Sequence, residues 1–452
     1  MKYSEINHSG YINTKSGEQI AYDLIDGRIT IHANEYIAEL DNTNLVVASS
    51  FDKGQFLFCT RLPIDLTENI WYPQNYKHPI NCVIKNYQPG AKYTKAKFSF
   101  SELQCLCPSL SAIYRPSKEE ILISRKPKVV KAFEVSVDNV LCKLEFVIRL
   151  KDGYSLGHGY LETYSEIEIS FDETFDLRFL YKIYRIVDSV FAFICNHQNT
   201  ACIKMSICGY YPSQMFANCD TVPCISDIYF IDEYREEPEE KSQSVQLINR
   251  RKFFQHIDVL FKMVAEDIST DKDESVNISI SSVHPSLKRR RLIDLQQSLH
   301  ITAAFEFYVR RYLPDMVEEK EYHVALKKVL QDFADANTGK AKKLAKSLLN
   351  HVVSEPSLSD KIIKVYNGFS TWKPLKACIS QEWFKEDEIK TLAEEANLWR
   401  NELAHEKRSY ESKVDTIRAI RLLEHLNYAI VLRQLGYGDG EIQELLKYTL
   451  LR

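Results

Sequence analysis

The stretch Leu398–His405 combines side chains that suit proton transfer and phosphate binding. It holds Arg400, then Asn401 directly after it, and His405 five positions after the arginine. A histidine with an unperturbed pKa of about 6.5 can activate a ribose 2′-OH or protonate a leaving 5′-oxygen at neutral pH. Arginine offers a permanent charge and a planar fork to phosphate oxygens, and asparagine can orient either group. These residue types therefore suit metal-independent cleavage of an RNA strand.

The spacing within this stretch gains its meaning from context. At about 100° per residue, Asn401 and His405 lie about 40° apart on a helix, while Arg400 lies about 140° from His405 and reaches the same site through its long stem. Ala404 precedes the histidine, and long helical patterns lie on both sides. Spacing alone has little value, because similar intervals occur elsewhere, at Arg250 or Arg251 with His256 and at Arg418 with His425.

A second group carries metal-ligating side chains, and its members are Cys195, His197, Cys202, Cys208, Cys219 and Cys224. Four residues separate Cys219 from Cys224, which is the wide end of zinc-knuckle spacing, and a second pair is not obvious. Zinc binding and buried free thiols on strands both remain open for this group. The nuclease chemistry itself needs no metal and no cofactor.

Composition and motifs exclude several classes of protein. The chain has 452 residues, 45% hydrophobic content and 11 cysteines, an odd number that favours reduced thiols. No segment reaches the roughly 18 uncharged apolar residues of a membrane span, and no signal peptide is evident, so we predict a cytoplasmic protein. The chain is acidic before residue 241 and slightly basic after it, which permits only local contact with a polyanion. Phosphate-loop, dinucleotide-binding, H-E-x-x-H and G-x-S-x-G motifs are missing.

The N-terminal part is predicted to be rich in β-structure, and residues 1–240 are assigned to one domain. Short β-branched or aromatic segments separated by turn residues predict strands at 19–25, 28–32, 55–59, 141–148 and within 159–171. A three-to-four-residue period predicts a helix over 176–195, with further strands near 201–207 and 224–231. The alternation favours a sandwich-like or related sheet domain, and the polar run 233–244 is the best linker.

After the linker, residues 241–452 are predicted to be all-helical, with a core of about 287–452. Helix stops such as Pro314, Gly339, Pro356, Pro374 and Gly436 separate the apolar stripes. The helices are expected at 245–267, 292–313, 317–336, 340–353, 358–369, 375–404, 411–435 and 440–451. The fold class is therefore α+β with several domains, a β-rich region followed by a helical bundle.

The string R-N-x-x-A-H at Arg400–His405, between two long helices of an all-α domain, resembles the R-x(4-6)-H signature of the HEPN superfamily. That resemblance implies a metal-independent endoribonuclease that works as a dimer or higher oligomer, with the motifs at the interface. A HEPN domain after a β-rich region also resembles the ApeA-type abortive-infection proteins of bacterial antiphage defence. Carried over, Arg400, Asn401 and His405 are the site residues, and the substrate is an RNA, with tRNA as a candidate.

The resemblance also implies regulation, in which the β-rich domain senses a phage-derived trigger in the bacterial cytoplasm and restrains the site until then. The alternative is a non-catalytic dimerising protein whose β-rich domain recognises a ligand or partner. In that alternative Arg400 makes a surface ion pair and His405 is a satisfied interface histidine.

Overall fold

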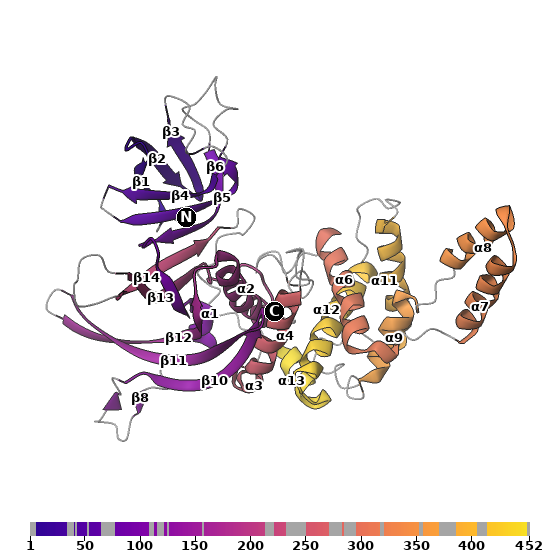
Figure 1. The fold of residues 1–452 in the computed structure, drawn as a ribbon. Helices are drawn as coiled ribbons and strands as arrows, with labels where there is room; N and C mark the ends of the chain where they lie inside the picture. The colour runs from indigo at the N-terminus through magenta and orange to yellow at the C-terminus, as the bar shows by residue number, and fades with distance from the viewer. Residues whose placement is uncertain are drawn as a thin grey trace. The chain divides into compact units, whose positions relative to one another are not determined.

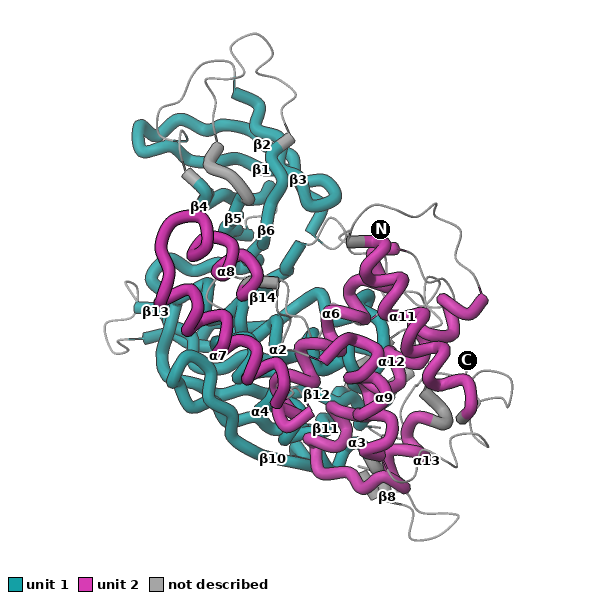
Figure 2. Tube along the Cα trace, turned by 90° about the vertical axis from the view of Figure 1, so that its right-hand side faces the viewer, with its two compact units in different colours: residues 1–246, 250–275, 285–287 teal, residues 247–249, 276–284, 288–452 magenta. Residues whose placement is uncertain are grey.

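The computed structural model describes residues 6–33, 40, 43–51, 54–64, 77–107, 113–114, 122–123, 126–155, 158–212, 221–231, 250–270, 283, 295–316, 321–351, 356–369, 386–404 and 414–449. The chain divides into two compact units (Figure 2). Unit 1 holds residues 1–246, 250–275 and 285–287, and unit 2 holds 247–249, 276–284 and 288–452. None of the described helices is long and apolar enough to span a membrane.

The first six strands of unit 1 close into an antiparallel barrel (Figure 1). Their order is β6-β3-β2-β1-β4-β5, and pairing of β5 with β6 closes the ring. The bounds are β1 His8–Asn13, β2 Gln19–Ile25, β3 Arg28–His32, β4 Thr43–Ser50, β5 Gln55–Ile64 and β6 Lys77–Lys85. The strands predicted at 19–25 and 28–32 are confirmed with the same bounds. Asp26 and Gly27 join them with positive φ values of 50° and 78°, as a tight two-residue hairpin requires.

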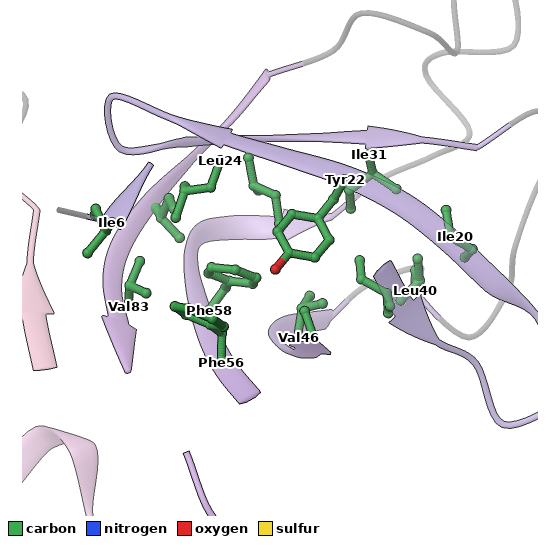
Figure 3. Close-up of a cluster of buried hydrophobic side chains, with 14 of the residues drawn as sticks. Ile6, Ile20, Tyr22, Leu24, Ile31, Leu40, Val46, Phe56, Phe58 and Val83 are labelled. Carbon is green, nitrogen blue, oxygen red and sulfur yellow. The ribbon is translucent and has the colours of Figure 1, made fainter. Parts of the chain in front are cut away.

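The barrel interior is filled by alternate side chains of these strands (Figure 3). In β2 the burial alternates along the strand, so that Tyr22 and Leu24 point inward. They meet Phe58 and Val83, each fully buried, within one apolar cluster. This inward and outward alternation is the pattern that predicted the strands, because successive side chains of a strand point to opposite faces.

The remaining long strands form an open sheet continuous with the barrel. The order from the barrel outward is β6-β14-β13-β7-β12-β11-β10, all antiparallel. The bounds are β7 Lys92–Phe98, β10 Lys128–Val137, β11 Val140–Ser155, β12 His158–Thr174, β13 Lys204–Pro212 and β14 Thr221–Phe230, with a separate pair β8 Ile113–Tyr114 and β9 Leu122–Ile123. The predicted β-rich region is thus confirmed, and its arrangement is a barrel joined to an open sheet.

Helices cover the apolar face of the open sheet. The predicted helix at 176–195 is confirmed as α2 Leu177–Cys195, which begins where the Asp176 side chain accepts a hydrogen bond from the Arg178 amide. It packs on the sheet through the ring pair Tyr184 and Phe230, whose centroids lie 4.2 Å apart. A shorter helix, α1, spans Ser101–Leu106.

Two helices that follow the predicted linker belong to unit 1. They are α3 Arg250–Gln255 and α4 Ile257–Thr270, within the stretch assigned from sequence to the helical domain. They belong to unit 1 because Phe261 of α4 packs on the sheet. Its ring is fully buried, and its centroid lies 5.6 Å from that of Phe133 and 6.1 Å from that of Phe146. The linker at 233–244 lies outside the described residues.

Unit 2 is helical, as predicted. Its elements are α6 Leu295–Tyr312, η6 Pro314–Met316, α7 Glu321–Ala336, α8 Gly339–His351, α9 Leu358–Gly368, η7 Glu386–Glu388, α11 Ile389–Ala404, α12 Val414–Gln434 and α13 Asp439–Thr449. The helix α12 is buried along most of its length and packs against α6, α11, α9 and α13. It is therefore the central helix of the bundle that holds α11 in place.

Candidate functional site

The helix α11 presents the candidate motif from one side and packs with the other. Its buried side chains recur at helical spacing, at Ile389, Leu392, Ala393, Ala396 and Trp399. The Trp399 indole donates a 3.1 Å hydrogen bond to the Ser298 hydroxyl of α6, which fixes the last turns of the helix in the core. Arg400 and Asn401, directly after this anchor, are exposed. The packing of α11 thus anchors the helix while leaving the two polar side chains of Arg400 and Asn401 accessible.

Two contacts orient the Arg400 guanidinium. One of its nitrogens donates to the Asn401 Oδ1 at 3.1 Å, and another lies 3.5 Å from a carboxylate oxygen of Glu306 on α6. The Arg400 side chain is 44% exposed and the Glu306 side chain 19%. Because these partners occupy only part of the guanidinium fork, which has five donors, N–H groups remain for an incoming anion.

Glu306 also contacts a buried cation. The Lys361 ammonium of α9 lies 3.8 Å from the other Glu306 carboxylate oxygen, and the lysine side chain is only 2% exposed. One carboxylate therefore stands between two cations from two other helices. Its charge compensates a lysine whose burial is otherwise costly. It also contacts one nitrogen of the Arg400 guanidinium while Asn401 accepts a hydrogen bond from another.

The prediction did not include Glu306 and Lys361. Glu306 lies 94 positions before Arg400, so no local pattern connects them. Lys361 carried a detectable signal, because it falls on the apolar stripe of α9 between Leu358, Ile362 and Val365, all of which are buried. A lysine on a buried helical face demands an acidic partner, and that demand was visible in the sequence.

His405 lies outside the described residues, one position after the end of α11. A hydrogen bond joins Arg400 and Asn401 in the structure. The sequence had predicted only that Asn401 shares a helix face with His405, so this contact was not expected. The role of the three residues in chemistry remains a prediction.

The second arginine–histidine interval in the bundle serves the helix packing. Arg418 makes ion pairs with Glu388 at 2.5 Å and Asp415 at 3.3 Å. His425 is 3% exposed, and its Nδ1 lies 2.6 Å from the Arg421 carbonyl oxygen. Similar spacing therefore gives structural contacts on α12 and exposed polar groups on α11, which supports the view that spacing by itself is uninformative.

The cysteine group is distributed through the β-rich unit. Cys195, His197 and Cys202 are buried, Cys208 and Cys224 lie on the neighbouring strands β13 and β14, and Cys219 is outside the described residues. Within the described part of the chain, no cluster of three or more histidine, cysteine or acidic side chains could hold a metal ion. Burial raises the pKa of the Cys195, Cys208 and Cys224 thiols, which favours their protonated form in the metal-free protein.

A thiol pair that the sequence did not reveal spans the barrel closure. Cys59 of β5 faces Cys82 of β6 in the antiparallel register. A hydrogen bond from the Cys82 thiol lowers the pKa of Cys59 to about 7, while the pKa of Cys82 is raised by that hydrogen bond and by burial. Cys59 is half-buried, so a reagent can reach it.

We expect Cys59 to react with iodoacetamide with a pH midpoint near its pKa of about 7. The rate should rise with pH through that value, because the thiolate is the nucleophile. Replacing Cys82 with alanine removes the donor and should shift the midpoint upward, whereas Cys82→Ser should retain much of the effect. Peptide mass spectrometry over a pH series measures this, with half-buried Cys224 as the slow internal reference. Identical Cys59 profiles in the parent and Cys82→Ala proteins would contradict the expectation.

Comparison with known proteins gives one match. Residues 299–440 match the family model described as Apea-like HEPN. The matched range begins inside α6, ends at the start of α13, and contains the Arg400–Glu306–Lys361 cluster and the whole R-N-x-x-A-H string. No curated protein and no solved structure matches the chain.

Proposed function

We propose that this protein is an endoribonuclease of bacterial antiphage defence that acts by abortive infection, because residues 299–440 match the Apea-like HEPN family model. Its site is built on the end of α11, and Arg400, Asn401 and His405 carry the reaction. The observation that supports this most directly is the Arg400 guanidinium, which is exposed and yet oriented by Asn401 and Glu306.

In the proposed reaction, a ribose 2′-oxygen attacks the adjacent phosphorus and the bond from phosphorus to the 5′-oxygen breaks. The 2′-OH loses its proton to a base and the departing 5′-oxygen gains one, which leaves a 2′,3′-cyclic phosphate and a 5′-OH. His405 serves as the proton-transfer group, because an imidazole changes protonation near neutral pH. Arg400 binds the non-bridging oxygens, whose negative charge grows in the transition state.

Asn401 has a positioning role in this scheme. Its Oδ1 accepts a hydrogen bond from Arg400 at 3.1 Å, which leaves its amide N–H groups available to His405 or the phosphate. The site operates in a dimer or higher oligomer that brings two such motifs together. A substrate RNA, with tRNA as a candidate, then meets two arginines and two histidines.

In this proposal the β-rich unit acts as the sensor. An unrestrained ribonuclease is toxic, so the activity has to be held off in a healthy cell and released by a phage-derived trigger. The barrel and open sheet of unit 1 would supply the surface for that recognition. We place the protein in the bacterial cytoplasm, where such a trigger and the RNA substrate meet.

The ends of cleaved RNA test the proposal. Purified protein, or cells after induction, should yield 5′-OH ends that polynucleotide kinase labels and 3′ ends that require removal of a cyclic phosphate. His405→Ala, folded as the parent by circular dichroism, should give no such ends and no protection from phage. Equal protection by the folded His405→Ala variant would favour the non-catalytic binding protein instead. Loss of cleavage on adding a chelator, with the fold intact, would contradict the metal-independent mechanism.

A further inference from the structure

The helices α7 and α8 form a hairpin with an unusual number of exposed apolar side chains. The two helices run side by side and are joined by Asn337 and Thr338 (Figure 1). The Asn337 amide donates to the Phe333 carbonyl at 2.8 Å, and Gly339 has a φ of +65° at the start of α8. Seven large apolar side chains are 46% to 63% exposed: Val324, which stands apart on α7, and a group of six, namely Tyr322, Leu326, Val329, Phe333, Leu344 and Leu348.

These six side chains share one face of the hairpin. Buried Ala334 and Ala345 mark where α7 and α8 meet. On α7 the four exposed side chains of this group fall within about 60° of one another, and on α8 the two leucines lie about 40° apart. On each helix these exposed side chains form a stripe that lies about 90° around the helix axis from the buried alanine. The direction of this rotation is the same on both helices. Because the short connection makes the helices antiparallel, both stripes lie on the same side, which we call the hairpin face.

The hairpin face is too large to be left in water without a reason. Six half-exposed side chains of this size offer roughly 600 Å² of apolar surface, which is the size at which exposed patches mark interaction sites. Two such faces together give about 1,200 Å², the lower end of specific protein–protein interfaces. Helices of this length are also marginal unless their apolar side is covered.

The charges on the outer edges of the hairpin point to its occupant. The helix α8 contains Lys340, Lys342, Lys343 and Lys346 and no acidic residue, whereas α7 has three acidic residues, Glu321, Asp332 and Asp335, against two lysines, Lys327 and Lys328. Asp332 and Lys343 are exposed and each lies about 160° from the buried alanine of its helix, on the outer edge. They are equally far in sequence from the two-residue connection. They therefore lie at the same height on opposite edges of the hairpin.

This arrangement is self-complementary. If a second hairpin faces the first about a twofold axis parallel to the helices, α7 of each copy lies over α8 of the other. A rotation about this axis does not change the position of a residue along the helix axis. Asp332 of each copy therefore lies beside the lysine edge of α8 in the other copy, and this contact occurs twice in the dimer. The lysines lie off the apolar stripe, which argues against a nucleic acid as its occupant.

We propose that the hairpin face of α7 and α8 pairs with the same face of a second copy of this chain. The pairing uses no residue of the Arg400 cluster and extends the proposed function by assigning a self-association surface. It does not depend on catalysis, and its test reads molecular mass. A monomeric parent would contradict both this pairing and the dimeric nuclease site, whereas an assembly whose mass does not depend on the hairpin face would contradict the pairing alone.

Multi-angle light scattering and sedimentation of the full-length chain test the pairing. Val329→Asp combined with Leu344→Asp places charge in the centre of the face and should halve the mass of the assembly or weaken its association at least tenfold. Val324→Asp is the matched control, because Val324 is 49% exposed on the same helix but about 170° from the stripe. The control should keep the parent mass. A monomeric parent, or equal masses for the stripe variant and the control, would overturn the proposal.

A charge exchange tests the twofold arrangement without touching the apolar stripe. Asp332→Lys alone and Lys343→Asp alone each place like charges together across the axis and should weaken association severalfold. The double exchange restores opposite charges and should recover the parent association. Since both residues are exposed, these variants are expected to fold even where the aspartate variants of the stripe do not. Single variants that associate as the parent, or a double exchange that fails to recover, would overturn the assigned geometry.

Discussion

Replacing Arg400 with alanine is expected to lower RNA cleavage by at least about 10²-fold, while leaving the free energy of unfolding within about 0.5 kcal/mol of the parent value. The guanidinium is the proposed ligand of the phosphate oxygens, so its loss removes stabilisation that matters most in the transition state. Its side chain is 44% exposed and its ion pair with Glu306 is long, at 3.5 Å, which explains the small expected effect on stability.

A graded series separates charge from geometry at this position. Arg400→Lys keeps the charge and loses the planar fork, so its activity should fall between those of the parent and Arg400→Ala. Glu306→Gln removes the carboxylate that constrains the guanidinium and also the charge that compensates buried Lys361. Per folded molecule, it should lower cleavage by less than Arg400→Ala. Lys390→Ala is the control, because it removes a cation that is 78% exposed on the same helix. Cleavage assays under single-turnover conditions measure the series. Parent-like activity of Arg400→Ala would remove this residue from the mechanism.

Replacing Phe261 with alanine is expected to destabilise the β-rich unit by about 3 to 5 kcal/mol. The ring is fully buried and contacts Phe133 and Phe146, so truncation leaves a cavity between α4 and the sheet. The neighbouring ion pair between Lys131 and Asp258, at 2.6 Å, holds α4 on the same strand and limits how far the helix can move to fill the cavity.

Denaturant unfolding, followed by a spectroscopic signal from the β-rich unit, measures this loss. Phe51→Ala is the matched control, because that ring is 71% exposed and the same truncation creates no cavity. The control should change the free energy of unfolding by about 0.5 kcal/mol or less. Equal effects for the two variants would mean that α4 does not stabilise the sheet.

Most of the helices and strands could be predicted from the sequence, but which of them pair or pack with one another could not. The strands at 19–25 and 28–32 were predicted with their bounds, because alternation and the Asp26–Gly27 turn are both local signals. The closure of the barrel depends on β5 pairing with β6, and the attachment of α4 depends on rings more than 100 positions away in the chain. Local periodicity carries no information on either.

The candidate site shows the same limit. The residue types at Arg400 and Asn401 indicated phosphate chemistry, and the family match covers that region. The contacts of Arg400 with Glu306, and of Glu306 with Lys361, depend on how α6, α9 and α11 pack. A lysine on a buried stripe could have signalled an acidic partner, although which acid it meets depends on the tertiary fold.

The strand β6 belongs to both the barrel and the open sheet, and this has a consequence for how the chain is made. Residues 82–85 pair with β5 on one edge and with β14 on the other, while residues 77–79 pair with β3. All six barrel strands lie within the first 85 residues, whereas β14 begins at Thr221. During synthesis from the N-terminus the barrel can close well before β14 leaves the ribosome. The edge of β6 at residues 82–85 that pairs with β14 then has no partner strand until residue 230 has been synthesised. This edge serves as the template on which the last strand adds to the sheet.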